Sequence, residues 1–256
     1  MSERSQQRGN LKDKGYCQRF NNEGSNMLRI DLHVPDDEYE TVRKLGAHWD
    51  ATTQIWYIDG SFDPEPFMQW LPFYNVHAEF WYLAQTQTAC PHCHEYTTVT
   101  AFILPAEHQL LEADNGDEPG TEVDYSEQDS PAFLFYIADI PTIVRNVLPG
   151  FHHTLRKAVS QRLRRQHWIN HCEHCEAQQD DTYMFAEVGG AFFPTSREQA
   201  AAIQLHRIDQ PFVGYCEDIS HNHYHFDPKL GGRICKACDW FECMTQVVNV
   251  PSKYLQ

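Results

Sequence analysis

The sequence contains no long hydrophobic run. No stretch approaches the roughly 18 apolar residues that a membrane-spanning helix needs, and the first residues, Met1 to Gln6, contain no apolar core of a secretion signal. These absences argue against an integral membrane protein and against a secreted one. We therefore expect a cytoplasmic protein without membrane contact, in a compartment where cysteine thiols stay reduced.

Basic residues are also scarce. Lysine and arginine total 20 against 36 acidic residues, which gives a formal net charge of −16. This balance argues against broad nonspecific affinity for nucleic acid, because binding to the phosphate backbone needs a basic surface. It is compatible with the opposite hypothesis, an acidic inhibitor or immunity-type protein that binds a basic protein partner.

One segment carries much of this negative charge. Residues 105–131 contain nine acidic residues and no lysine or arginine. Asn115-Gly116 and Pro119-Gly120 within it are typical of turns. The segment is predicted to be an acidic insertion, either a solvated loop or a docking surface for a basic partner.

The remaining composition is that of a folded protein. Of the 256 residues 41% are hydrophobic and 13% aromatic, which are globular values. The length allows one large domain or two or three small ones. Residues 1–26, in contrast, are polar and show no periodicity, so they are predicted to be a disordered tail.

Residues 27–75 show the pattern of a small β-α-β-β-α domain. Apolar and polar residues alternate from Leu28 to Val34, as in a half-buried strand. A helix is predicted after Pro35 and ends before Gly46, a common C-terminal stop. The segment from Trp49 to Ile58 predicts a hairpin, and a short last helix ends near Trp70.

Several motifs in this domain resemble a known family. Leu45-Gly46-Ala47, Trp49-Asp50, Trp56-Tyr57 and Phe67 to Leu71 follow the signature L-G-A-x-W-D-x5-W-Y and then F-x-x-W-L of a small domain of unknown function. That domain occurs as an accessory module in plasmid primase-like and other mobile-element proteins, so the resemblance implies DNA handling rather than an activity. The tryptophans are expected in the core, with a stacking surface for bases or a peptide as the alternative.

Two cysteine pairs predict a metal site. Cys90 and Cys93 form one C-x-x-C hook, and Cys172 and Cys175 form a second. Such pairs in a cytoplasmic protein are typical zinc ligands, and two pairs complete a tetrahedral four-thiolate site. Because that site leaves no open position for water, it predicts a structural zinc ion rather than a catalytic one.

The surroundings of the hooks resemble an uncharacterised bacterial zinc-ribbon protein. The shared features are C-P-x-C followed by a T-x-V run, W-x-N-H-C-x-x-C, and Phe192-Phe193-Pro194. We therefore expect a zinc-ribbon domain over residues 76–214 that contains the acidic insertion.

A basic helix is predicted over residues 152–166. Leu155, Val159 and Leu163 have the i, i+4, i+8 spacing of an apolar helical stripe. The basic residues around it form a candidate surface for nucleic acid or a partner, with solvation or pairing with the acidic insertion as the alternative: Arg156, Lys157, Arg162, Arg164 and Arg165.

The segment 215–256 is rich in histidine and cysteine and allows two hypotheses. The first is a second zinc site with Cys216, His223, Cys235 and Cys238 as ligands. The second is a resemblance to HNH-type nucleases, which implies that His223, with His225, activates water beside a divalent metal. Asn222 replaces the aspartate of that family's pattern.

Together these features predict an α+β protein with a small accessory domain and a zinc-ribbon core carrying a helical insertion. The favoured function is a non-catalytic zinc-binding adaptor that works with nucleic acid or with the DNA-processing enzymes of mobile elements. An acidic inhibitor and an HNH-like nuclease remain the alternatives. One zinc ion is expected, or two if the C-terminal ligands form a site.

Overall fold

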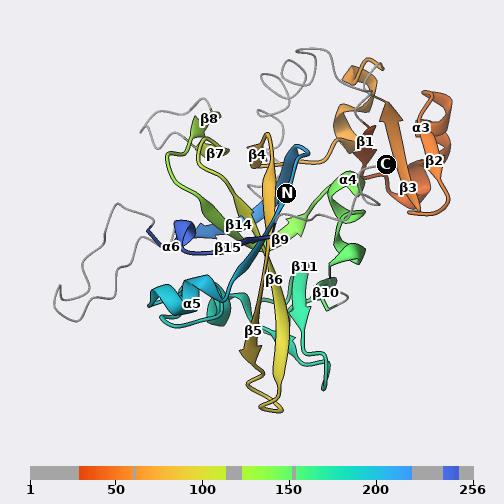
Figure 1. The fold of residues 1–256 in the computed structure, drawn as a ribbon. Coiled ribbons are helices and arrows are strands. Elements are labelled where there is room, and N and C mark those ends of the chain that lie inside the picture. The colour runs from red at the N-terminus through yellow and green to blue at the C-terminus, as the bar shows by residue number, and fades with distance from the viewer. Residues whose placement is uncertain (1–28, 60–61, 114–122, 152–153, 221–238, 248–256) are drawn as a thin grey trace. The chain divides into compact units, whose positions relative to one another are not determined.

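The computed structural model describes residues 29–59, 62–113, 123–151, 154–220 and 239–247 (Figure 1). The predicted polar tail 1–26 lies outside these residues. The chain divides into two compact units, Met1–Phe73 and Tyr74–Gln256. Among the described residues, no helix has the length and apolar character needed to span a membrane.

The first unit has the expected β-α-β-β-α order. It consists of β1 (Arg29–Leu32), η1 (Asp36–Glu38), α3 (Tyr39–Lys44), β2 (His48–Asp50), β3 (Ile55–Asp59) and the 3-10 helix η2 (Glu65–Trp70). The three strands form an antiparallel sheet in the order β1-β3-β2. Gly46 ends the helical segment with φ of 101°, a left-handed conformation that glycine adopts without steric cost.

The tryptophans of this unit differ in burial. Trp56 and Trp70 pack in its core with Val42 and Phe67, as predicted. Trp49, in contrast, is 41% exposed on the edge strand β2, where it lies against Trp56 at 5.4 Å between ring centroids. The motif therefore places two tryptophans in the core and one on the surface.

A nine-stranded sheet dominates the second unit, with the order β15-β13-β5-β6-β9-β14-β4-β7-β8. Among the described strands of this sheet, β13 and β15 pair in parallel and the other neighbouring pairs are antiparallel. The bounds are β4 (Val76–Ala78), β5 (Trp81–Ala89), β6 (Tyr96–Leu104), β7 (Gln109–Ala113), β8 (Val123–Glu127), β9 (Ala132–Asp139), β13 (Gln204–Ile208), β14 (Phe212–Ser220) and β15 (Thr245–Val247). The expected domain boundary at residue 214 falls within β14.

The central strands bury both of their faces. On β5, Trp81 and Leu83 belong to one hydrophobic cluster, while Tyr82 and Ala84 belong to another, as the two-residue period of a strand requires. The first cluster includes residues of α4 (Thr142–Arg145) and η3 (Leu148–Gly150). The second includes residues of η4 (Thr182–Ala186), α5 (Arg197–Ala201) and α6 (Asp239–Glu242).

The acidic insertion contains strands. Within residues 105–131, β7 and β8 pair as an antiparallel hairpin, and β7 also pairs with β4. The turn signals at 115–116 and 119–120 lie outside the described residues. The two strands of the insertion, β7 and β8, thus extend the sheet rather than form a loop.

The prediction of a basic helix over residues 152–166 is wrong. The described part of this segment forms β10 (Arg156–Val159), a turn, and the start of β11 (Gln166–His171), which pair as a hairpin. A third short strand, β12 (Gln178–Gln179), joins them. The three residues of the supposed stripe do not share one buried face, since Leu155 is buried in the first hydrophobic cluster whereas Val159 is 58% exposed. Pairing with β11, which leads into Cys172, determines the conformation here.

Candidate metal centre

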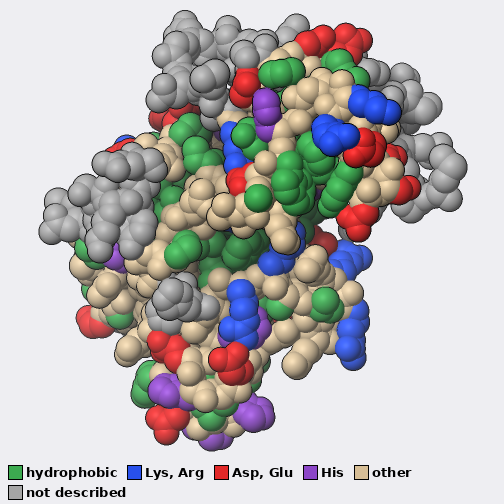
Figure 2. All heavy atoms as spheres, turned by 90° about the vertical axis from the view of Figure 1, so that its right-hand side faces the viewer, with side chains coloured by type: hydrophobic (Ala, Val, Ile, Leu, Met, Phe, Trp, Pro, Cys, Tyr) green, Lys and Arg blue, Asp and Glu red, His purple; other side chains and the backbone are tan. Residues whose placement is uncertain are grey.

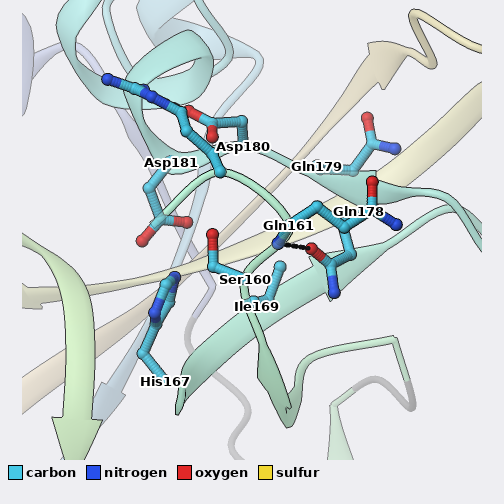
Figure 3. A pocket seen from close by; sticks show the side chains of 9 residues that line it. Ser160, Gln161, His167, Ile169, Gln178, Gln179, Asp180 and Asp181 are labelled. Carbon is cyan, nitrogen blue, oxygen red and sulfur yellow. Dashed lines mark hydrogen bonds and ion pairs between the residues drawn. The ribbon is translucent and has the colours of Figure 1, made fainter. Parts of the chain in front are cut away.

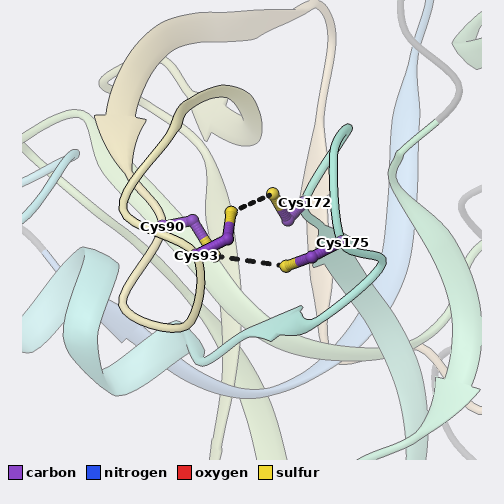
Figure 4. A group of neighbouring side chains, drawn as sticks. All are labelled: Cys90, Cys93, Cys172 and Cys175. Carbon is purple, nitrogen blue, oxygen red and sulfur yellow. Dashed lines mark hydrogen bonds between the residues drawn. The ribbon is translucent and has the colours of Figure 1, made fainter.

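The four hook cysteines come together, as predicted. Cys90 and Cys93 lie in the turn between β5 and β6, and Cys172 and Cys175 lie in the turn between β11 and β12 (Figure 4). The Sγ atoms of Cys90 and Cys175 are 3.7 Å apart, as are those of Cys93 and Cys172. All four lie within 4.8 Å of one another.

These distances fit a zinc ion. A tetrahedron with zinc–sulfur bonds of about 2.3 Å has sulfur–sulfur edges of about 3.8 Å. The backbone amide of His92 donates to Cys90 Sγ and that of His174 donates to Cys172 Sγ, both at 3.4 Å. Donors aimed at the sulfurs stabilise thiolates, the form that binds zinc. The four cysteines would therefore hold one zinc ion, which joins two hairpins and leaves no coordination position for a substrate.

The four thiols influence one another's ionisation. Burial opposes ionisation of Cys90, but hydrogen bonds from the amides of Cys93 and His92 outweigh it and lower the pKa of this thiol to about 6. The Glu95 amide favours the Cys93 thiolate, yet burial and the neighbouring thiols together raise the pKa of Cys93 to about 12. The neighbouring thiols thus oppose ionisation of Cys93, and a divalent cation would balance half of the negative charge of four thiolates.

Both hooks have the same backbone geometry. The residue after the second cysteine has a positive φ, 65° for His94 and 62° for Glu176. Its amide donates to the carbonyl of the first cysteine, at 2.9 Å in one hook and 3.0 Å in the other. This left-handed position costs a non-glycine residue about 1 kcal/mol.

We expect His94→Gly to stabilise the second unit by about 1 kcal/mol, because glycine removes the steric cost at a positive φ. Chemical denaturation of the zinc-loaded protein measures the change. His92→Gly is a matched control two positions away, since His92 is not among the residues with positive φ. The control is expected to be neutral or destabilising. Equal effects of the two changes would contradict the explanation.

Side chains that the sequence analysis did not predict as functional connect the β5–β6 hairpin to the hairpin of β11 and β12. The side-chain Nδ2 of Asn170 donates to the backbone carbonyl of Thr100, and its Oδ1 accepts from the backbone amide of Thr100, both at 2.8 Å. The backbone amide of Glu173 donates to Thr97 Oγ1 at 3.0 Å, and the Glu173 carboxylate accepts from the backbone amide of Thr98 at 2.9 Å. In the sequence, this contact could have been found from the asparagine of the W-x-N-H-C motif and the threonines of β6.

A third turn repeats the geometry of the hooks without cysteine. Between β10 and β11, the Ser160 amide donates to the Arg165 carbonyl at 2.9 Å, and the Arg164 amide donates to the Ser160 carbonyl at 3.0 Å. Arg164 has φ of 56°, like His94. Ser160 and Leu163 occupy the positions of the two cysteines, and Ser160 Oγ accepts from the Leu163 amide at 3.0 Å.

The five basic residues of the candidate binding surface lie on this hairpin, and four of them form ion pairs. The pairs are Arg156–Glu176, Lys157–Asp139, Arg162–Asp180 and Arg165–Glu217, with nitrogen–oxygen distances of 2.6, 3.9, 3.0 and 2.9 Å. These acids lie outside the acidic insertion. Arg164 forms no ion pair within the described residues. On the part of the face that Figure 2 shows in colour, Lys and Arg side chains are scattered, several of them beside Asp or Glu.

The second predicted metal set is described only at Cys216. His223, His225, Cys235 and Cys238 lie outside the described residues, so the second zinc site and the nuclease hypothesis stay predictions. Cys216 is buried in the hydrophobic cluster with Val76 and Phe212. Burial raises the pKa of its thiol to about 12.

Comparisons with known proteins concern the first unit. Residues 29–72 match a family described as "Domain of unknown function (DUF5710)". A 42-residue stretch is 43% identical to "DNA primase TraC" of Escherichia coli; it covers 16% of this chain and 4% of that protein. No solved structure matches the chain. The chain thus shares its small N-terminal domain with a plasmid primase, and its second unit carries a four-cysteine cluster that could bind one metal ion such as zinc.

Proposed function

We propose that the protein is a non-catalytic, zinc-binding adaptor that works with the DNA-processing enzymes of mobile elements. The observation that carries this proposal is the domain at residues 29–72, which this chain has in common with a DNA primase. The closed four-cysteine cluster supports a structural role for zinc, because no ligand position is left for catalysis.

The exposed edge of the first unit supports a protein partner. Trp49 packs on Tyr39 at 5.6 Å and leaves 41% of its surface exposed. The described part of this unit carries nine acidic side chains and three basic ones. Such a charge balance repels phosphate and suits a basic protein segment, for which an exposed tryptophan is a favourable anchor.

Tagged full-length protein recovered from plasmid-bearing and plasmid-free cells of one strain tests the proposal. After nuclease treatment, plasmid-encoded DNA-processing proteins are expected to co-purify with the wild type, and Trp49→Ala is expected to reduce their recovery at least tenfold. Trp49→Ala costs little stability because the side chain is half exposed, so it preserves the fold. Identical protein sets from both cell types would contradict the proposal.

Direct contact with nucleic acid is tested separately. Arg164 is the basic residue of the hairpin that forms no ion pair with any described residue, so Arg164→Glu is expected to weaken retention on immobilised DNA at physiological salt if phosphate is the ligand. Arg197→Glu, an exposed reversal on α5 in the same unit, is the matched control. Absence of DNA retention by the wild type would restrict the adaptor to protein partners.

A further inference from the structure

A small pocket adjoins the metal centre. It has a volume of about 150 Å³ and lies between the Ser160 turn, β11 and the segment that follows β12 (Figure 3). Because one water molecule occupies about 30 Å³ of liquid, the pocket has room for a group larger than a single water. Gln179 lines it and also donates to Cys90 Sγ at 3.5 Å, so the pocket wall contacts a metal ligand directly.

Asp181 is the buried acid of this pocket. It is 5% exposed, and its Oδ2 accepts from the Tyr136 amide at 2.7 Å. In Figure 3 its carboxyl group points into the pocket, toward His167 and Ser160. Within the described residues it forms no ion pair. Since a buried carboxylate needs a compensating cation or several donors, Asp181 is incompletely matched by its own chain.

The surrounding groups do not supply the missing positive charge. Arg162 donates to Asp180 Oδ1 at 3.0 Å and to Thr182 Oγ1, and Arg165 pairs with Glu217. His167 is buried in an edge-to-face contact with Tyr136, and burial lowers its pKa, which favours the neutral ring. In the described part of the chain, the four cysteines are the one cluster of three or more metal-ligating side chains, so a bare metal ion does not fit this pocket.

We propose that the pocket binds an organic cation with N–H donors, a guanidinium or alkylammonium group, which pairs with the Asp181 carboxylate. Two sources share this chemistry: an arginine or lysine side chain of a protein partner, and a free small amine. Ser160 Oγ and His167 face the same space and offer further hydrogen-bonding positions. The proposal is independent of the adaptor function.

Binding is expected to depend on pH. Burial raises the pKa of Asp181 to about 7, so the carboxylate that the cation needs is mostly absent at pH 6 and mostly present at pH 8. The other charged groups nearby are the Arg162–Asp180 and Arg165–Glu217 pairs, and burial lowers the pKa of His167. Affinity is therefore expected to increase about tenfold between these two pH values.

Titration of the full-length, zinc-loaded protein with methylguanidinium and with methylammonium, followed by the NMR signals of the His167 ring, tests the pocket. Saturable binding is expected, stronger than that of tetramethylammonium, which has the same charge but no N–H donor. Asp181→Asn, which keeps the acceptor for Tyr136, is expected to weaken binding at least tenfold. Glu187→Gln removes an exposed charge six positions away and is expected to change binding less than twofold.

The source of the cation follows from a second titration, with an arginine-containing peptide and its citrulline counterpart. Tighter binding of the arginine peptide than of methylguanidinium supports a partner's side chain, and binding of methylguanidinium as tight as or tighter than that of the peptide supports a free small cation. Absence of saturable binding by every cation, or undiminished binding by Asp181→Asn with a wild-type zinc content, would overturn the proposal and indicate a water-filled pocket.

Discussion

Replacement of Cys172 by serine is expected to lower the zinc content by one ion per chain and to destabilise the second unit. Cys172 is buried, and its Sγ lies 3.7 Å from that of Cys93. Structural zinc sites contribute about 10 kcal/mol or more of binding free energy at neutral pH. Loss of one ligand is therefore expected to lower the free energy of unfolding by at least several kcal/mol. Metal analysis and thermal unfolding measure the two effects.

Cys243→Ser is the matched control for this experiment. Cys243 is a free cysteine of the same unit that does not belong to the four-sulfur cluster, so its replacement is expected to preserve the zinc. Removal of zinc by a chelator is expected to reproduce the effect of Cys172→Ser. A Cys172→Ser protein with wild-type zinc content and stability would show that the four cysteines are not a metal site.

Replacement of Asp181 by asparagine is expected to stabilise the protein at high pH. Burial raises the pKa of Asp181 from 3.8 to about 7, so between these values the folded state binds more protons than the unfolded state. Stability is then lost as the pH rises through this window, by on the order of 4 kcal/mol at completion. Asparagine carries no proton to lose, and its side-chain oxygen still accepts from the Tyr136 amide.

Urea denaturation at pH 5 and pH 8, in a buffer free of amines, measures this difference. The variant is expected to exceed the wild type by a few kcal/mol at pH 8 and by much less at pH 5, while Glu187→Gln is expected to follow the wild type at both. An equal gain or loss at the two pH values would mean that Asp181 does not titrate in this range.

The local motifs predicted the parts of the structure that depend on short-range geometry. C-x-x-C spacing predicted each hook, and the strand, glycine stop and hairpin of the first unit followed from alternation and turn residues. The prediction that the two hooks lie together is also confirmed. It rested on the requirement of a tetrahedral site for four sulfur ligands. These features are encoded within a few residues, or by a chemical requirement for a known number of ligands.

Features that depend on a distant partner were missed. Leu155, Val159 and Leu163 satisfy the spacing of a helix, yet the chain pairs with β11 instead, and the left-handed Arg164 forms the turn. Asp181 follows another aspartate and has no sequence signal of burial. Its environment arises only when β9 supplies the Tyr136 amide. The candidate pocket was therefore not predictable from the sequence.

The separation of the two hooks has a consequence for biosynthesis. Cys93 and Cys172 are 79 positions apart, and β7, β8 and β9 are made between them. During translation the first hook leaves the ribosome several seconds before its partner, at about 5–20 residues per second. A lone pair of thiols cannot complete the tetrahedral site, so tight metal capture must await the second hook. Formation of the metal site is thus expected to begin only after the second hook has been made and to depend on the zinc available at that moment.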